Sequence, residues 1–232
     1  RAHSSDKICL FKLINPLATV SEPTEQAEET LKNMAFRSED PEIAAMAQLA
    51  LGAQARRIAA VSPERVAKIV DRFTQELKRA SSPEMTKQLL LALGNAGSSR
   101  ALPEILELAT SSSPDLRATA LHALRFIDSP QAETLLVKAL RSDPDSSVRV
   151  AAANALGYRE ITEASFKAQK EIFSKDANVT VRLKVLENLW KAEQAFPEVR
   201  RLVKKAASED PSEDIRKAAR NIMTQYSEGY FK

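Results

Sequence analysis

Four arginines recur at nearly regular intervals in the second half of this chain. They are Arg117, Arg149, Arg182 and Arg216, each preceded by Leu, Val or Ile and followed by a run rich in alanine or leucine. The intervals between them are 32, 33 and 34 residues. A period of this length is typical of stacked pairs of helices and not of one compact globule. Stacked repeats characteristically present extended binding faces, so the period also favours a function in binding.

The composition favours helices throughout. Only 5 of the 232 residues are Gly and 5% are aromatic, whereas Ala, Leu, Glu, Lys and Arg are abundant. Proline preceded by Ser or Asp marks several helix starts, as at Asp40-Pro41 and Asp143-Pro144. Apolar residues at three- and four-residue spacing predict helices at 5–15, 24–37, 41–59, 63–80, 83–96, 102–111, 114–127, 131–142, 145–157, 161–174, 177–193, 196–208 and 212–226.

These segments predict an all-α fold, a right-handed α-α superhelix of about six helical hairpins. We expect a single domain over residues 1–232, and a chain that is a fragment of a longer protein. The second helix of each hairpin is rich in alanine and forms the inner, tightly packed layer, in which Leu124 and Leu156 are buried.

Aspartates accompany most of the recurring arginines. Asp143, Asp176 and Asp210 each precede an arginine by six residues, and Ser111 has this place before Arg117. We therefore expect each arginine to bind an aspartate or a turn carbonyl in its own or the adjacent repeat, in a structural ladder. The alternative is a row of arginines that binds a phosphate or carboxylate ligand.

A second candidate surface lies on the inner helices. His122, Asn154 and Glu187 fall at equivalent positions of successive inner helices, two residues before a leucine. They predict a shared polar face, which is either solvated or in contact with a partner.

Nothing in the sequence indicates an enzyme or a cofactor. The two histidines lack the four-residue spacing of a helical metal pair, and no catalytic residue, cofactor site or metal site is predicted. The single cysteine, Cys9, is expected to be buried in an apolar run. The net charge of +3 argues against a nucleic-acid partner, including the DNA-glycosylase function that some related folds support. No apolar run is long enough to span a membrane.

The repeats resemble HEAT repeats in the Asp143-Pro144 turn, the Val/Ile-Arg pairs and the alanine-rich inner helix at 152–156. Across residues 41–226 they also resemble the helical domain of the vitellogenin family of large lipid transfer proteins. The phrases Leu51-Gly52 and Leu93-Gly94-Asn95-Ala96-Gly97 carry that resemblance. The usual Tyr before the first glycine and Cys after it are missing here.

The vitellogenin resemblance implies a non-enzymatic helical scaffold within a lipid-transport protein, packed on an adjacent β-rich domain or a partner protein. Lipid would then be bound only indirectly, and the compartment implied is secreted or cell-envelope. The alternative is a generic HEAT-repeat scaffold for protein–protein interaction without a lipid role.

Overall fold

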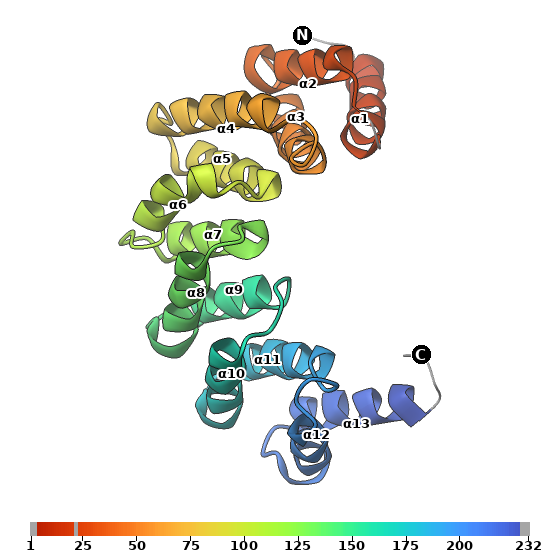
Figure 1. Cartoon of the computed structure of the whole chain (residues 1–232), viewed down its shortest axis with the longest axis vertical. Coiled ribbons are helices and arrows are strands. Elements are labelled where there is room, and N and C mark those ends of the chain that lie inside the picture. Colours follow the sequence, from red (N-terminus) through yellow and green to blue (C-terminus); the bar gives the residue numbers. More distant parts are fainter. Residues whose placement is uncertain (1–3, 21–22, 228–232) are drawn as a thin grey trace. The chain divides into compact units, whose positions relative to one another are not determined.

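The computed structural model describes residues 4–20 and 23–227, and all the regular structure in these ranges is helical. It contains the all-α repeats that the sequence predicts (Figure 1). The helices are α1 (Ser4–Thr19), α2 (Glu25–Arg37), α3 (Pro41–Arg57), α4 (Pro63–Lys78), α5 (Pro83–Ala96), α6 (Leu102–Leu108), α7 (Pro114–Ala123), α8 (Pro130–Ser142), α9 (Ser146–Leu156), α10 (Glu163–Lys175), α11 (Val179–Lys191), α12 (Glu198–Glu209) and α13 (Glu213–Ser227). Short 3₁₀ turns precede α6 and follow α7.

Polar caps start most of the helices where the sequence indicates them. The side chains of Asp40, Ser82 and Ser113 accept hydrogen bonds from the first-turn N–H groups of α3, α5 and α7, and proline follows each cap. The prediction for α9 was wrong in its detail. Its cap is Asp145, whereas Asp143 lies in the preceding turn and accepts the N–H of Asp145 at 3.0 Å.

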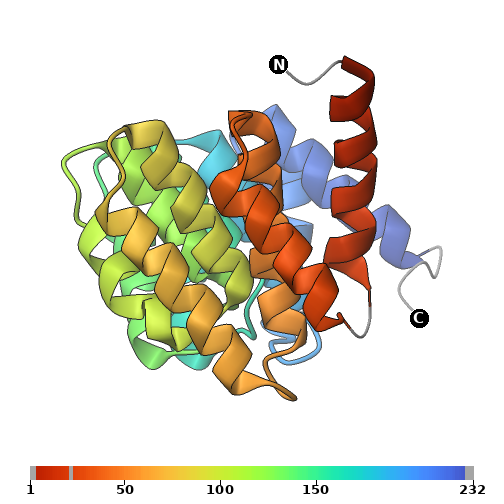
Figure 2. The same cartoon turned by 90° about the horizontal axis from the view of Figure 1, so that it is seen from above.

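The chain forms two compact units, 1–132 and 133–232. The prediction of a single continuous domain over 1–232 therefore remains a prediction. In the first unit, α3 packs against α5 and α5 against α7, while α2, α4 and α6 cover the other side of this row. Helix α1 lies beside α2 and α3 (Figure 2).

Two glycines let the inner helices of the first unit approach closely. A Cβ added to Gly52 would lie 2.2 Å from the carbonyl oxygen of Ala92, and one added to Gly94 would lie 2.5 Å from the Cα of Ala123. Both distances are too short for real side chains. The Leu-Gly phrases of the sequence therefore mark contacts between neighbouring inner helices.

The second unit repeats this arrangement. Helix α11 packs against α9 and α13, and the pairs α10–α11 and α12–α13 form hairpins. Leu156 is 4% exposed here and Leu124 is fully buried in the first unit, as predicted. The expectation for Cys9 was wrong, because its side chain is exposed on α1.

Candidate functional site

The turn before α11 and the inner helix α9 are joined by a buried ion pair. The guanidinium of Arg149 donates two parallel hydrogen bonds to the carboxylate of Asp176, from Nε at 2.7 Å and from Nη2 at 3.0 Å. The side chains are 16% and 4% exposed. The remaining Nη1 donates to the carbonyl oxygens of Asp143 and Pro144 in the turn that begins the arginine's own repeat. Arg149 thus connects two successive repeats.

Asp176 also shapes the turn that it occupies. Its Oδ1 accepts the N–H of Asn178 at 2.8 Å, which fixes the entry into α11. Burial alone would raise the pKa of the Asp176 carboxyl group, but the hydrogen bonds from Arg149 and from the Asn178 N–H outweigh burial and lower this pKa below its ordinary value. The same pairing raises the pKa of Arg149. Both groups are therefore charged at neutral pH.

The next step of the ladder is also an arginine–aspartate pair, but its hydrogen bonds come from different nitrogen atoms of the arginine. Arg182 donates from Nη1 and Nη2 to the two carboxylate oxygens of Asp210 at 3.0 and 2.8 Å, and both side chains are at most 10% exposed. Its Nε is buried and has no hydrogen-bond acceptor among the described residues. Arg182 is thus the ladder member that keeps an unsatisfied donor.

The first and last arginines bind the carbonyls of their own turns. Arg117 Nη1 donates to the carbonyl oxygens of Ser111 and Ser112 at 3.0 and 3.1 Å. Arg216 Nη1 donates to the carbonyl oxygens of Asp210 and Pro211 and its Nε to Glu213. The geometry thus brings aspartate and arginine together across repeats within the second unit, while within a repeat the arginine meets the backbone of the turn.

A buried amide network, which the sequence reasoning missed, holds α9, α10 and α11 together. The side-chain nitrogen of Asn188 donates to the carbonyl oxygen of Ala153 at 2.7 Å and to Gln169 Oε1 at 2.8 Å. Gly157 leaves room for this side chain, because an added Cβ would lie 2.2 Å from the Asn188 oxygen. In the first unit, the side-chain nitrogen of Asn95 likewise donates to a carbonyl oxygen of the preceding inner helix, that of Leu49, at 3.1 Å. The available sequence signal was an asparagine within each of these two leucine-rich inner helices, α5 and α11.

The predicted polar face is divided between the units. His122 lies in α7 of the first unit, half-buried, and burial followed by the charge of Arg125 lowers its pKa. Asn154 and Glu187 lie on the neighbouring inner helices α9 and α11 of the second unit. Asn154 is half-buried, whereas Glu187 is exposed and pairs with Lys184 at 2.9 Å. Of the predicted face, the second unit thus holds Asn154 and Glu187 on neighbouring inner helices.

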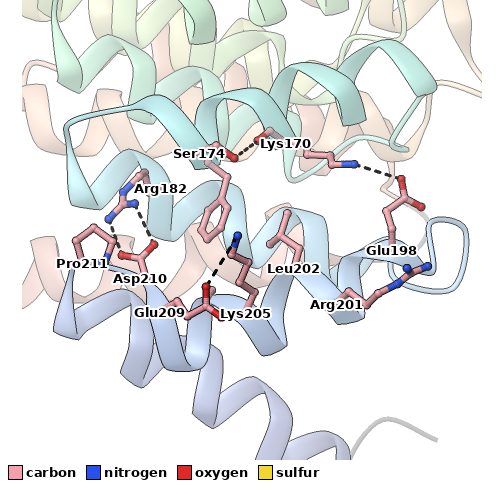
Figure 3. A pocket seen from close by; sticks show the side chains of 12 residues that line it. Lys170, Ser174, Arg182, Glu198, Arg201, Leu202, Lys205, Glu209, Asp210 and Pro211 are labelled. Carbon is pink, nitrogen blue, oxygen red and sulfur yellow. Dashed lines mark hydrogen bonds and ion pairs between the residues drawn. The ribbon is translucent and has the colours of Figure 1, made fainter.

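A surface groove of about 760 Å³ lies between α10 and α12 (Figure 3). Its apolar side chains include Phe173, Leu202 and Ala206, and charged side chains of both signs surround them. The charged members are Lys170, Arg182, Glu198, Arg201, Lys205, Glu209 and Asp210. Sequence reasoning missed this groove because its walls belong to two helices about thirty residues apart.

The part of the chain that the structure describes contains no group of three or more His, Cys, Asp or Glu residues arranged to hold a metal ion. Among the same residues, no helix has the length and apolar character of a membrane span.

Comparisons with known proteins support the repeat architecture. A family model of HEAT repeats matches residues 70–157. No curated protein matches the sequence. The chain is similar in structure to the complex of CpcE and CpcF of phycocyanin lyase from Nostoc sp., with a TM-score of 0.53 and 20% identity over 68% of this chain and 99% of that chain.

A second solved structure, an archaeal HEAT-like repeats protein from Thermococcus onnurineus, aligns over 98% of both chains with a TM-score of 0.46 and 18% identity. None of these comparisons supports the resemblance to vitellogenin, and the Leu-Gly phrases behind it are explained by the close approach of inner helices. The chain is therefore an all-α protein of HEAT-like repeats, and the family model of HEAT repeats matches residues 70–157.

Proposed function

We propose that this protein is a non-enzymatic scaffold that binds a partner protein through the surface of its stacked repeats. The observation that carries the proposal is the buried inter-repeat bonding of the second unit. The Arg149–Asp176 pair and the contacts of Asn188 fix α9 against its neighbours, so the side chains that point away from these contacts are held at constant spacing. A preorganised surface loses less entropy when a protein binds it.

Asn154 and Glu187 are the proposed contact residues on the inner helices. Neither residue takes part in the buried hydrogen bonds and ion pair that fix α9 and α11. The carboxylate of Glu187 forms an exposed ion pair with Lys184. Exposed ion pairs of this kind contribute roughly 0.2–1 kcal/mol, so a partner can replace Lys184 at little cost. In this proposal the ladder arginines act structurally and do not bind a ligand.

Quantitative co-purification from the source organism tests this function. The variants Asn154→Lys and Glu187→Lys should each lower the amount of bound partner at least about fivefold, because a new or reversed charge at a contact costs on the order of 1 kcal/mol or more. Lys138→Glu, an exposed charge reversal on α8, is the matched control and should leave the amount unchanged. Equal recovery of partner with all three variants would refute the proposed surface.

A further inference from the structure

The groove between α10 and α12 is larger than the groove one repeat earlier. The α10–α12 groove measures about 760 Å³, whereas the groove lined by Arg141, Arg149, Glu171 and Lys175, between α8 and α10, measures about 360 Å³. Both grooves are formed by the same pair of positions in successive repeats. The side chains of the two grooves differ in how their charges are compensated.

The smaller groove neutralises its cations internally. Glu171 binds Arg141 at 3.3 Å and Lys175 at 3.1 Å. The pKa of Glu171 is lowered, first by the hydrogen bond from Lys175 and its charge and then by Arg141. The Glu171 carboxylate thus pairs with Arg141 and Lys175, and the third cation of the α8–α10 groove, Arg149, binds Asp176.

In the larger groove, Arg182 binds Asp210 and Lys170 lies 3.7 Å from Glu198, but the other two cations are poorly compensated. Arg201 and Lys205 stand one turn apart on α12, where like charges repel each other. Lys205 meets Glu209 only at 3.9 Å, with both side chains more than 60% exposed. Arg201 has no ion pair among the described residues. The two acids of the α12 wall, Glu198 and Glu209, lie at the ends of the helix and leave its middle positive (Figure 3).

One buried donor of α11, next to the groove, lacks an acceptor among the residues that the structure describes. Arg182 lines the groove, and its Nε makes no hydrogen bond, whereas the Nε of Arg149 binds Asp176 in the equivalent place. Because this Nε atom is buried, the exposed cations Arg201 and Lys205 are the groups that indicate an occupant carrying carboxylates.

We propose that the α10–α12 groove binds an acidic amphipathic helix of a partner protein. This inference rests on the proposed scaffold function and names the chemistry of one partner. The apolar face of the occupant contacts Phe173, Leu202 and Ala206, and its carboxylates bind Arg201 and Lys205. The dimensions agree, because walls of 13 and 12 residues extend about 18 Å, or roughly three turns of a helix. Recognition of a helix in a groove uses anchors at i, i+3, i+4 and i+7, which span about 10.5 Å and so fit within this length.

Three synthetic peptides test the proposal against the full chain by fluorescence anisotropy at physiological salt. The first has leucines at helical spacing flanked by glutamates, the second carries lysines in place of the glutamates, and the third is the acidic peptide with a central proline. The acidic helical peptide should bind at least about fivefold more tightly than the basic peptide, since two charge contacts of roughly 0.5 kcal/mol each give that factor. It should also bind more tightly than the peptide with the central proline, which cannot form a continuous helix. Equal affinities for the acidic and basic peptides would overturn the proposal.

Variants locate the binding. The double variant Arg201→Glu/Lys205→Glu and the variant Leu202→Glu should each lower the affinity for the acidic peptide at least about tenfold. Lys138→Glu/Lys204→Glu is the matched control, since it makes the same change of charge at exposed positions outside the groove lining and should change affinity less than about twofold. Unaltered binding to R201E/K205E would place the peptide elsewhere and reject the groove.

Three further outcomes separate the explanations. Displacement of the acidic peptide by millimolar inorganic phosphate alone would identify a simple anion site and overturn the helix proposal. Failure of the peptide tests together with loss of partner in the Glu187→Lys variant would reject the groove and leave the scaffold function standing. Failure of both sets of variants would reject the scaffold function itself.

Discussion

Removal of Asp176 should destabilise the second unit far more than removal of an exposed charge. Asp176→Ala deletes two parallel hydrogen bonds from Arg149 and the bond from the Asn178 N–H, and it leaves a guanidinium that is 16% exposed beside an empty space. Breaking a buried ion pair by removing one partner costs about 3–5 kcal/mol. Because Arg149 keeps its bonds to Asp143 and Pro144, we expect the lower end, about 3 kcal/mol.

Urea denaturation followed by circular dichroism measures this loss as a decrease in the free energy of unfolding. Lys167→Ala is the control, because it removes an ion pair with Glu163 whose side chains are 68% and 66% exposed. That pair contributes roughly 0.3–0.5 kcal/mol. Asp176→Asn separates the two functions of the side chain, since asparagine retains an acceptor for the Asn178 N–H but not the charge.

A double-mutant cycle completes the test. The losses for Asp176→Ala and Arg149→Ala should not add, and their coupling energy should be about 2 kcal/mol. A coupling energy near zero, or a loss for Asp176→Ala no greater than that for Lys167→Ala, would refute the structural ladder. Unchanged stability of Arg149→Ala together with lost ligand binding would instead favour the row of ligand-binding arginines.

The remaining predictions concern packing and pH. Gly94→Ala should destabilise by about 1–3 kcal/mol despite the higher helix propensity of alanine, because its Cβ would lie 2.5 Å from Ala123; a thermal melt at or above that of the wild type would contradict the close approach of α5 and α7. Leu156→Ala should lower the free energy of unfolding by about 2–5 kcal/mol, as measured by urea denaturation. The folded pKa of His122 is lowered, so the unfolded state binds its proton first, and stability should fall as pH drops below about 6.5. His122→Gln should flatten this part of the stability profile. Since the pKa of Asp176 is lowered, the advantage of wild type over Asp176→Asn should persist at neutral pH and shrink as pH falls below about 4.

The helices of this protein follow from local sequence signals, but the contacts between repeats do not. Proline after a polar cap placed α3, α5 and α7 correctly, because capping is decided within one turn. The spacing of aspartate and arginine indicated a ladder. It did not reveal that Asp176 binds the arginine of the preceding repeat, since a spacing within one segment carries no information about its neighbour in space.

Residues with two physical explanations were the hardest to interpret. Gly52 and Gly94 suggested a family resemblance, whereas their structural cause is the approach of the next inner helix. In the sequence, Asn188 cannot be distinguished from other polar residues of an inner helix. In the structure it is buried and donates hydrogen bonds to Ala153 and Gln169. The α10–α12 groove depends on how two distant outer helices pack, and no local pattern encodes it.

Site-specific photo-crosslinking in intact cells of the source organism tests the scaffold function most directly. A photoreactive amino acid is introduced in place of Glu187 on the inner helix α11, in place of Arg201 in the α10–α12 groove, or in place of Lys138 on α8 as the control. We expect one defined protein to be crosslinked reproducibly from position 187, an acidic segment to be crosslinked from position 201, and neither from position 138. The same background of products from all three positions would contradict a protein-binding scaffold.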